Sequence, residues 1–222
     1  MRIIGIIPAR GGSKGIPRKN LQPIGNSSLI GLKINQAIDS ICTEVWVSTE
    51  DKEISEASRN HGAEVISRPE ALSTDDAGTD AVLLHAIDFL GCSDQDILVL
   101  LQPTSPLIKL TSIDACIQKL IDNPQLNSVI SIREAHPFMW NTCDDISWNP
   151  EGHTRSLRPR RQDLGKSGWE TGGCYSIRVG ALREQLVRYP EPTGILEVGF
   201  LEALDIDTLQ DLESARRVLF KE

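Results

Sequence analysis

The chain has 222 residues and a formal net charge of −8, with 23 Lys and Arg against 31 Asp and Glu. This length suits one domain with a sizeable core, and the negative charge argues against a nucleic-acid-binding surface. No stretch approaches the roughly 18 apolar residues of a membrane span, and the opening apolar run is too short for a signal peptide.

The cysteines and histidines are scattered along the chain. The five cysteines are odd in number and have no CxxC spacing, which predicts reduced thiols and a cytoplasmic location rather than a disulfide framework. The four histidines are equally dispersed, so the sequence gives little support to a zinc site.

Short apolar runs alternate with amphipathic stretches over the first 132 residues, the pattern of an α/β sheet with parallel strands. In chain order we expect a strand at 2–8, a helix at 28–41, a strand at 44–48, a helix at 52–62, a strand at 63–67, a helix at 79–91, a strand at 96–103, a helix at 111–123 and a strand at 128–132.

The alternation breaks between residues 134 and 170. Three prolines, three tryptophans and an Arg-rich run predict an irregular arm here rather than a second domain. The apolar cluster at 137–140 has no place in the sheet pattern and predicts an interface. Regular structure is expected again at 172–179, followed by a strand-like segment at 203–207 and a helix at 208–222.

The loop after the first expected strand, GGSKGIPRKN at 11–20, combines three glycines with cations. In an open α/β sheet, ligands bind beyond the carboxyl ends of the strands. Glycines there let backbone N–H groups approach a phosphate, and cations neutralise its oxygens. The chain lacks both GxxxxGK[ST] and GxGxxG. By itself the loop therefore fits a phosphate cradle and a solvated surface loop about equally well.

The longer string IIPARGGSKGIPRKN at 6–20 closely resembles the N-terminal signature of the CMP-sialic acid synthetases, also called acylneuraminate cytidylyltransferases. In that family the loop binds the triphosphate of CTP. The related KDO cytidylyltransferases carry a Ser-Thr-Arg pattern that this chain lacks. The residues that match nucleotide-binding positions are Arg10, Ser13, Lys14, Lys19 and Asn20.

The string LLQPTSPL at 100–107 places Gln102 where a buried strand must end, because Pro103 cannot continue the hydrogen-bond ladder. By itself the string reads as a plain turn between a strand and a loop. It is similar to a second signature of the same family, in which the matching Gln contacts the acyl sugar. KDO enzymes usually have an acidic segment there.

The segment ALDIDTLQDL carries two carboxylates, Asp205 and Asp207, at positions i and i+2. On a strand this spacing points both to one face, and paired carboxylates beside phosphates suit Mg²⁺. An equally good interpretation from the residues alone is that Asp207 caps the final helix. The family's equivalent segment supplies metal-binding carboxylates, so the resemblance implies Mg²⁺ on both residues.

Matches occur in three further segments, of which the one with Arg161 is the strongest. Arg68 and Thr79 match positions that face the cytidine. Arg161 belongs to an Arg-rich run that by itself reads as solvated surface, but it matches an Arg at the sugar site. Thr171 and Tyr175 also match sugar-site positions, although the sialic acid enzymes have Asn where this chain has Thr171. We therefore predict that N-acetylneuraminate is not the best substrate and that a legionaminic-type or deaminated relative is preferred.

The resemblance runs from Ile3 to Asp211. It implies a single three-layer, Rossmann-like nucleotidyltransferase domain over residues 1–222, with a mostly parallel sheet and a small dimerisation arm. The implied reaction joins CTP to a nine-carbon acidic sugar and releases pyrophosphate, with Arg10, Lys19 and Asp207 as catalytic residues and Mg²⁺ as cofactor. A homodimer is expected, without nucleic-acid or membrane partners. The alternatives are a nucleotidyltransferase for another acceptor, such as KDO, and a catalytically silent nucleotide-binding protein.

Overall fold

The computed structural model describes residues 1–13, 15–74, 77–135, 138–142, 147–151, 156–157, 159–163 and 165–220. Lys14 and Pro137, two residues singled out from the sequence, lie outside the described residues. The side chain of Arg161 does as well.

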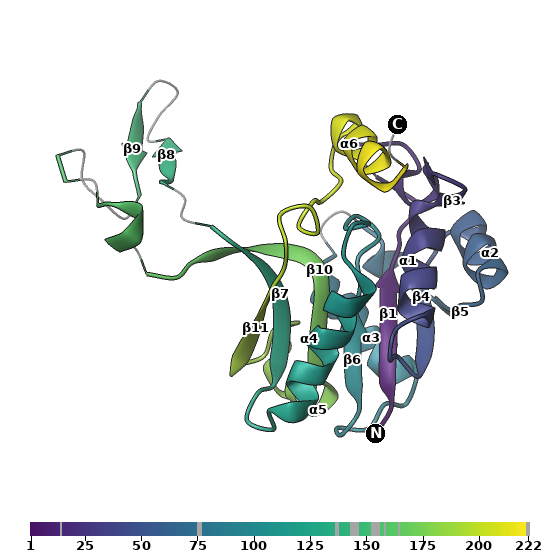
Figure 1. Ribbon diagram of the computed structural model, residues 1–222. Helices are drawn as coiled ribbons and strands as arrows, with labels where there is room; N and C mark the ends of the chain where they lie inside the picture. The colour runs from purple at the N-terminus through teal and green to yellow at the C-terminus, as the bar shows by residue number, and fades with distance from the viewer. Residues whose placement is uncertain are drawn as a thin grey trace.

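A seven-stranded sheet forms the centre of the molecule (Figure 1). Six strands run parallel, while β10 is antiparallel to both of its neighbours. The predicted mostly parallel sheet is confirmed. In spatial order the strands are β11 (Thr193–Glu197), β7 (Ser128–Glu134), β10 (Gly168–Arg178), β6 (Ile97–Leu100), β1 (Ile3–Pro8), β4 (Glu44–Thr49) and β5 (Glu64–Ser67).

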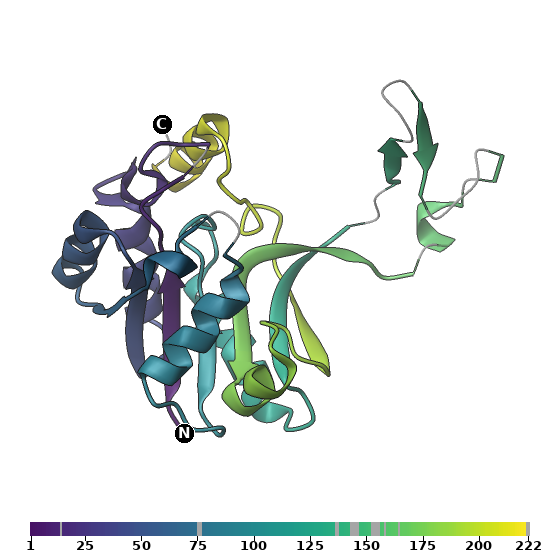
Figure 2. The ribbon, with the colours of Figure 1, turned by 180° about the vertical axis from the view of Figure 1, so that it is seen from behind.

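Helices cover both faces of the sheet and complete the three predicted layers (Figures 1 and 2). Because the central strands are buried on both faces, they are apolar almost throughout, and all four residues of β6 are fully buried. One face carries α1 (Leu29–Ile38), α2 (Lys52–Asn60) and α4 (Leu110–Asp122), and the other carries α3 (Thr79–Phe89) and α5 (Val179–Gln185).

The last helix, α6 (Leu209–Phe220), packs outside these layers. Its buried residues Leu212 and Ala215 share a small apolar cluster with Ile24 of the hairpin formed by β2 (Pro23–Ile24) and β3 (Ser27–Ser28). The cluster also includes Ile16 and Ile206, which lie in the glycine loop and in the segment before α6. It therefore joins the N-terminal loop to the C-terminal carboxylate segment.

Three parts of the fold differ from the expectation. The segment 203–207 is not a strand, because the backbone bond from Ile206 N–H to the carbonyl of Thr104 (2.8 Å) does not extend into a ladder. Helix α5 and strand β11 were not expected, since both are short and β11 is a half-buried edge strand. Strand β10 begins at Gly168, inside the segment predicted to be irregular.

Strands β7 and β10 extend beyond the body as a two-stranded ribbon, with Gly168 opposite Glu134. The ribbon leads into an arm that projects away from the main sheet (Figures 1 and 2). The arm carries the hairpin of β8 (Trp140–Thr142) and β9 (Trp148–Pro150), together with the single 3₁₀ turn η3 (Arg161–Asp163).

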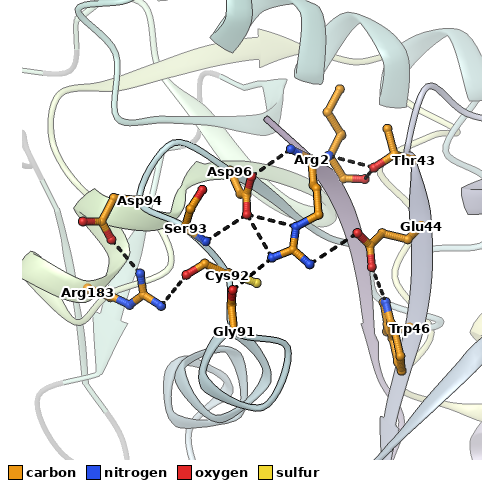
Figure 3. Close-up of polar contacts among 11 residues, drawn as sticks. Arg2, Thr43, Glu44, Trp46, Gly91, Cys92, Ser93, Asp94, Asp96 and Arg183 are labelled. Carbon is orange, nitrogen blue, oxygen red and sulfur yellow. Dashed lines mark hydrogen bonds and ion pairs between the residues drawn. The ribbon is translucent and has the colours of Figure 1, made fainter.

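At the amino ends of the parallel strands, Arg2 and Asp96 tie β1 to the start of β6 (Figure 3). Asp96 accepts hydrogen bonds from the backbone N–H (2.8 Å) and Nε (3.1 Å) of Arg2, and from the N–H of Ser93 (2.9 Å). Burial opposes ionisation of this carboxyl group, but these bonds prevail and hold the pKa of Asp96 at about 2. No helix among the described residues is long and apolar enough to cross a membrane.

Candidate active site

A cleft of about 420 Å³ opens at the carboxyl ends of the parallel strands. Its walls come from the loop after β1, the segment after β5, the start of α3, the turn after β6 and the approach to α6. This is the edge at which open α/β sheets bind ligands. The structure brings together there the predicted residues Arg10, Ser13, Lys19, Asn20, Arg68, Thr79, Gln102 and Asp207.

The glycine loop is held in place by close backbone approaches. The N–H of Gly11 donates to Glu50 Oε1 (2.7 Å), and a Cβ on Gly11 would lie only 2.4 Å from Asp51 Oδ2. A Cβ on Gly15 would lie 2.5 Å from the backbone oxygen of Asp207. A side chain at either position would therefore force the loop or the neighbouring group to shift. In addition, Asn20 Nδ2 donates to the carbonyl oxygen of Arg10 (2.9 Å).

The described cations of the loop divide into two groups. Lys19 Nζ donates to the carbonyl oxygen of Ile206 (2.7 Å) and to Asp207 Oδ1 (3.2 Å), while Arg10 lines the cleft. Arg18 instead donates to Asp51 (2.9 Å from Nη2 to Oδ1) and pairs with the exposed Glu53. Arg10 and Lys19 therefore line the cleft, whereas Arg18 binds the loop to the start of α2.

Arg68 and Glu50 form a second charged group at the edge of the cleft. Arg68 is 6% exposed, and its Nη2 donates to Glu50 Oε2 (3.0 Å). Burial lowers the pKa of Arg68, and Glu50 partly offsets this effect. Arg68 Nε is buried without a hydrogen-bond partner among the described residues. An unpaired donor in the wall of a cleft favours a ligand that accepts from it.

The two C-terminal carboxylates flank the fully buried Ile206. Asp207 lines the cleft, and Asp205 Oδ1 lies 3.4 Å from Ser105 Oγ, which donates to it. The surrounding protein excludes water from the Asp205 carboxyl group and raises its pKa, and the charge of Asp207 adds to this effect. Asp205 is not among the described residues that line the cleft; a cation bound near its carboxylate would offset the effect of the Asp207 charge.

The structure separates these carboxylates from the cap of α6. Asp211 accepts from the N–H (2.8 Å) and the hydroxyl (2.7 Å) of Thr208, and the Asp211 N–H donates back to Thr208 Oγ1 (3.2 Å). These two residues cap the helix, so the Asp207 carboxylate is not needed for that purpose.

The donors at this position suit Mg²⁺, which prefers carboxylate oxygens together with phosphate and water oxygens. Within the described ranges, no three His, Cys, Asp or Glu side chains gather closely enough to hold a metal by themselves. A metal held by Asp205 and Asp207 would need further oxygen ligands, such as those of water or a phosphate.

Gln102 reaches the cleft because β10 is irregular beside it. The pairing of β10 with β7 shifts register between Glu170 and Tyr175. Within this bulge, Gly172 adopts a left-handed φ of +68°, and a Cβ there would lie 2.5 Å from Gln102 Oε1. Glycine at this position leaves room for the Gln102 carboxamide.

Three predicted sugar residues are not among the described residues that line the cleft. Thr171 is 5% exposed, and its hydroxyl donates to the carbonyl oxygen of Ser131 (3.1 Å). Tyr175 is buried among the side chains under α3 and α5, and its hydroxyl donates to Glu170. Burial, and then this bond, raise the pKa of Tyr175. The backbone of Arg161 lies in the arm.

Residues 4–141 match the family model described as Cytidylyltransferase. The chain belongs to the cytidylyltransferase family. The predicted resemblance is confirmed, and as a member of this family the protein is a nucleotidyltransferase.

Curated relatives of this cytidylyltransferase match over much of its length. It is 33% identical to a pseudaminic acid cytidylyltransferase of Campylobacter jejuni, with 100% of this chain and 97% of the relative covered. It is 31% identical to N-acylneuraminate cytidylyltransferase A of Danio rerio, with 84% of this chain and 44% of the relative covered. It is 32% identical to an N-acylneuraminate cytidylyltransferase of Streptococcus agalactiae, with 95% and 52% covered.

Solved structures support the fold. A CMP:2-keto-3-deoxy-manno-octonic acid synthetase complexed with CTP superposes with a TM-score of 0.73 at 20% identity, covering 100% of this chain and 99% of the other. A 4-diphosphocytidyl-2C-methyl-D-erythritol synthase superposes with a TM-score of 0.70 at 12% identity, covering 98% and 99%.

Sequence reasoning missed Glu50, which joins the glycine loop of this cytidylyltransferase to Arg68. One signal was available. Glu50 and Asp51 directly follow a buried strand, and acidic groups at the carboxyl edge of a sheet lie close to a cationic loop after the neighbouring strand.

Proposed function

We propose that this cytidylyltransferase transfers CMP from CTP to a nonulosonic acid and releases pyrophosphate. The observation that carries the proposal is the convergence of Arg10, Lys19, Arg68 and Asp207 on one cleft. The family match supports the cytidylyl donor, and the pseudaminic acid and N-acylneuraminate relatives support a nonulosonic acceptor.

In the proposed reaction, the anomeric hydroxyl of the acceptor attacks the α-phosphorus of CTP in line with the leaving pyrophosphate. The new oxygen–phosphorus bond forms as the bond from the α-phosphorus to the bridging oxygen of pyrophosphate breaks, and the hydroxyl proton passes to water. Such chemistry depends mainly on positioning and charge neutralisation.

The residues of the chain divide this work. Arg10, Lys14 and Lys19 neutralise the leaving phosphates, and Ser13 of the same loop donates a hydrogen bond to them. Glu50 bonds to Arg68 and positions it where the cytosine base would bind. Thr79 lines the cleft nearby. Asp205 and Asp207 would hold Mg²⁺, which supplies further charge neutralisation to the phosphates when bound.

For the acceptor, we propose a nonulosonic acid decorated differently from N-acetylneuraminate. The full-length match to a pseudaminic acid cytidylyltransferase supports this choice, as does Thr171 at the position where sialic acid enzymes have Asn. Because the Thr171 hydroxyl is bonded to Ser131, its influence would come from the shape of the β10 bulge rather than from a direct hydrogen bond to the sugar.

A pyrophosphate-release assay tests this function. The acceptors are N-acetylneuraminate, pseudaminic, legionaminic and deaminated nonulosonic acids, and KDO, each with CTP, UTP, ATP and GTP. We expect CTP to be strongly preferred and a nonulosonic acid other than N-acetylneuraminate to have the highest specificity constant. A preference for KDO, or comparable turnover with ATP or GTP, would contradict the assignment. Release from no combination would favour a silent nucleotide-binding protein.

We further propose a homodimer in which the arm serves the partner's cleft. The arm and the neighbouring surface expose large apolar side chains, including Trp140 and Trp148 on the arm hairpin and Phe200 and Leu201 beside β11. Such patches are typical of interfaces. The arm also projects away from the body that carries the cleft (Figure 2), so Arg161 is assigned to the site of a second copy.

Mixing two inactive variants tests the shared site. Arg161→Ala and Asp207→Asn homodimers are both expected to lose activity. If Arg161 acts in the partner's site, re-association should restore about a quarter of the wild-type activity, because half of the random dimers then carry one intact site of two. Light scattering that finds a monomer at micromolar concentration would refute the dimer. The cytoplasmic location stays a prediction.

A further inference from the structure

Lys33 occupies an unusual position in the core of this protein. It lies on the buried face of α1 with Ile30, Ile34 and Ala37, at the i, i+3 and i+4 spacing of an apolar stripe. Its side chain is 0% exposed. A lysine is almost never fully buried unless it is paired with an acid.

The buried amine has a single polar partner in the described structure. Lys33 Nζ donates to the carbonyl oxygen of Ser105 (2.9 Å), and no carboxylate pairs with it among the described residues. Burial lowers the pKa of Lys33 to about 7. An unpaired buried charge weakens the folded state, and an apolar residue of similar volume is often neutral or stabilising at such a site. Stability by itself therefore does not explain this lysine.

Ser105, the partner of Lys33, connects three segments that form the site. Its N–H donates to the carbonyl oxygen of Gln102 (3.2 Å). Its hydroxyl lies within donating distance of the carbonyl oxygen of Thr171 (3.2 Å) and of Asp205 Oδ1 (3.4 Å). The turn after β6, the β10 bulge and the carboxylate segment thus meet at one side chain.

Helix α1 anchors this turn at a second, separate point. Gln36, one helical turn after Lys33, donates from Nε2 to the carbonyl oxygens of Pro106 (2.9 Å) and Ile108 (3.0 Å). These bonds hold the approach to α4 without touching Ser105. Lys33 is therefore the contact from α1 that bears directly on the connection at Ser105.

We propose that Lys33 is a positioning residue for the acceptor side of the reaction. Through Ser105, it holds Gln102 and the β10 bulge at Thr171 in place beside the sugar. This role rests on the proposed function. It explains why a costly buried amine occupies a position that suits an apolar side chain.

The test is Lys33→Met, which keeps the length of the side chain and removes its charge and donor. We expect an unchanged or higher melting temperature, because a buried unpaired charge is gone. The specificity constant for the acceptor should fall at least about tenfold, as expected when a hydrogen bond to a charged group is lost. The dissociation constant of CTP, measured without acceptor, should stay within about twofold.

Two further variants separate positioning from simple packing. Ser105→Ala keeps the carbonyl that Lys33 binds but removes the hydroxyl, and it should reproduce the loss on the acceptor side. The double variant should be no worse than Lys33→Met, since the two residues act in one chain of contacts. Gln36→Met is the matched control and should keep wild-type acceptor kinetics.

The outcomes are distinguishable from failure of the proposed function itself. If the wild type releases no pyrophosphate with any acceptor, the proposed function fails. If Lys33→Met melts well below the wild type, the residue is structural and the positioning role is overturned, whatever the activity. Wild-type acceptor kinetics in Lys33→Met or in Ser105→Ala would also overturn it.

Discussion

Gly11→Ala should damage nucleotide binding although it adds only one methyl group. The new Cβ would lie 2.4 Å from Oδ2, 2.9 Å from Cγ and 3.0 Å from Cβ of Asp51. Asp51 cannot easily move away, because it pairs with Arg18 and also accepts the N–H of Ile54 (3.0 Å) at the start of α2. The loop must shift instead, and the bond from Gly11 N–H to Glu50 should lengthen or break.

The size of the effect follows from this geometry. Overpacking by one methyl group at a rigid site costs about 1–3 kcal/mol. If the loop can reach its binding position only by taking up that strain, kcat/KM for CTP should fall about 5- to 150-fold, at 1.36 kcal/mol for each factor of ten. The φ of Gly11 is not in the left-handed region, so the loss is due to contact rather than to backbone conformation.

Gly12→Ala is the matched control, because a Cβ there has no atom of the described residues within 4 Å. Steady-state kinetics with varied CTP should show a raised KM for Gly11→Ala and near wild-type values for Gly12→Ala. Equal activity of both variants would refute the argument from close approach. Equal damage in both would mean that loop flexibility, not the Asp51 contact, is what matters.

Other substitutions test the remaining parts of the site and the fold. Asp207→Asn should lower kcat about 100-fold or more and increase the Mg²⁺ requirement at an unchanged melting temperature; near-normal turnover in limiting Mg²⁺ would show that no metal binds there. Glu50→Gln should raise the KM for CTP about tenfold by weakening the hold on Arg68, whereas Glu53→Gln should not, and equal effects would contradict the Glu50 role. Because the folded pKa of Asp96 is depressed to about 2, its contribution to stability is complete above its ordinary pKa and is lost as the pH falls from about 4 toward 2. Acid titration of unfolding should therefore be less steep in Asp96→Asn, and identical profiles would contradict this linkage.

Most strands of the sheet, though not β11, could be predicted from local sequence, as could a glycine loop beside the carboxyl end of β1. Strands such as β6 are buried on both faces, so a short run of apolar residues identifies them without knowledge of their partners. The strings at 6–20 and 100–107 could also be recognised, because each is a short pattern of neighbouring residues. Each begins at the carboxyl end of a strand, and the carboxyl ends of parallel strands must meet at one edge.

Tertiary contacts decided the rest. Glu50 meets Gly11 from 39 residues away, and Lys33 meets Ser105 from 72 residues away. The antiparallel direction of β10 and its bulge turn the Thr171 hydroxyl to Ser131 rather than into the cleft. The expected strand at 203–207 is absent because the bond from the Ile206 N–H to the carbonyl oxygen of Thr104 does not extend into a ladder. Periodicity in a sequence reports which residues are buried, whereas hydrogen-bond partners far along the chain depend on how the elements pack.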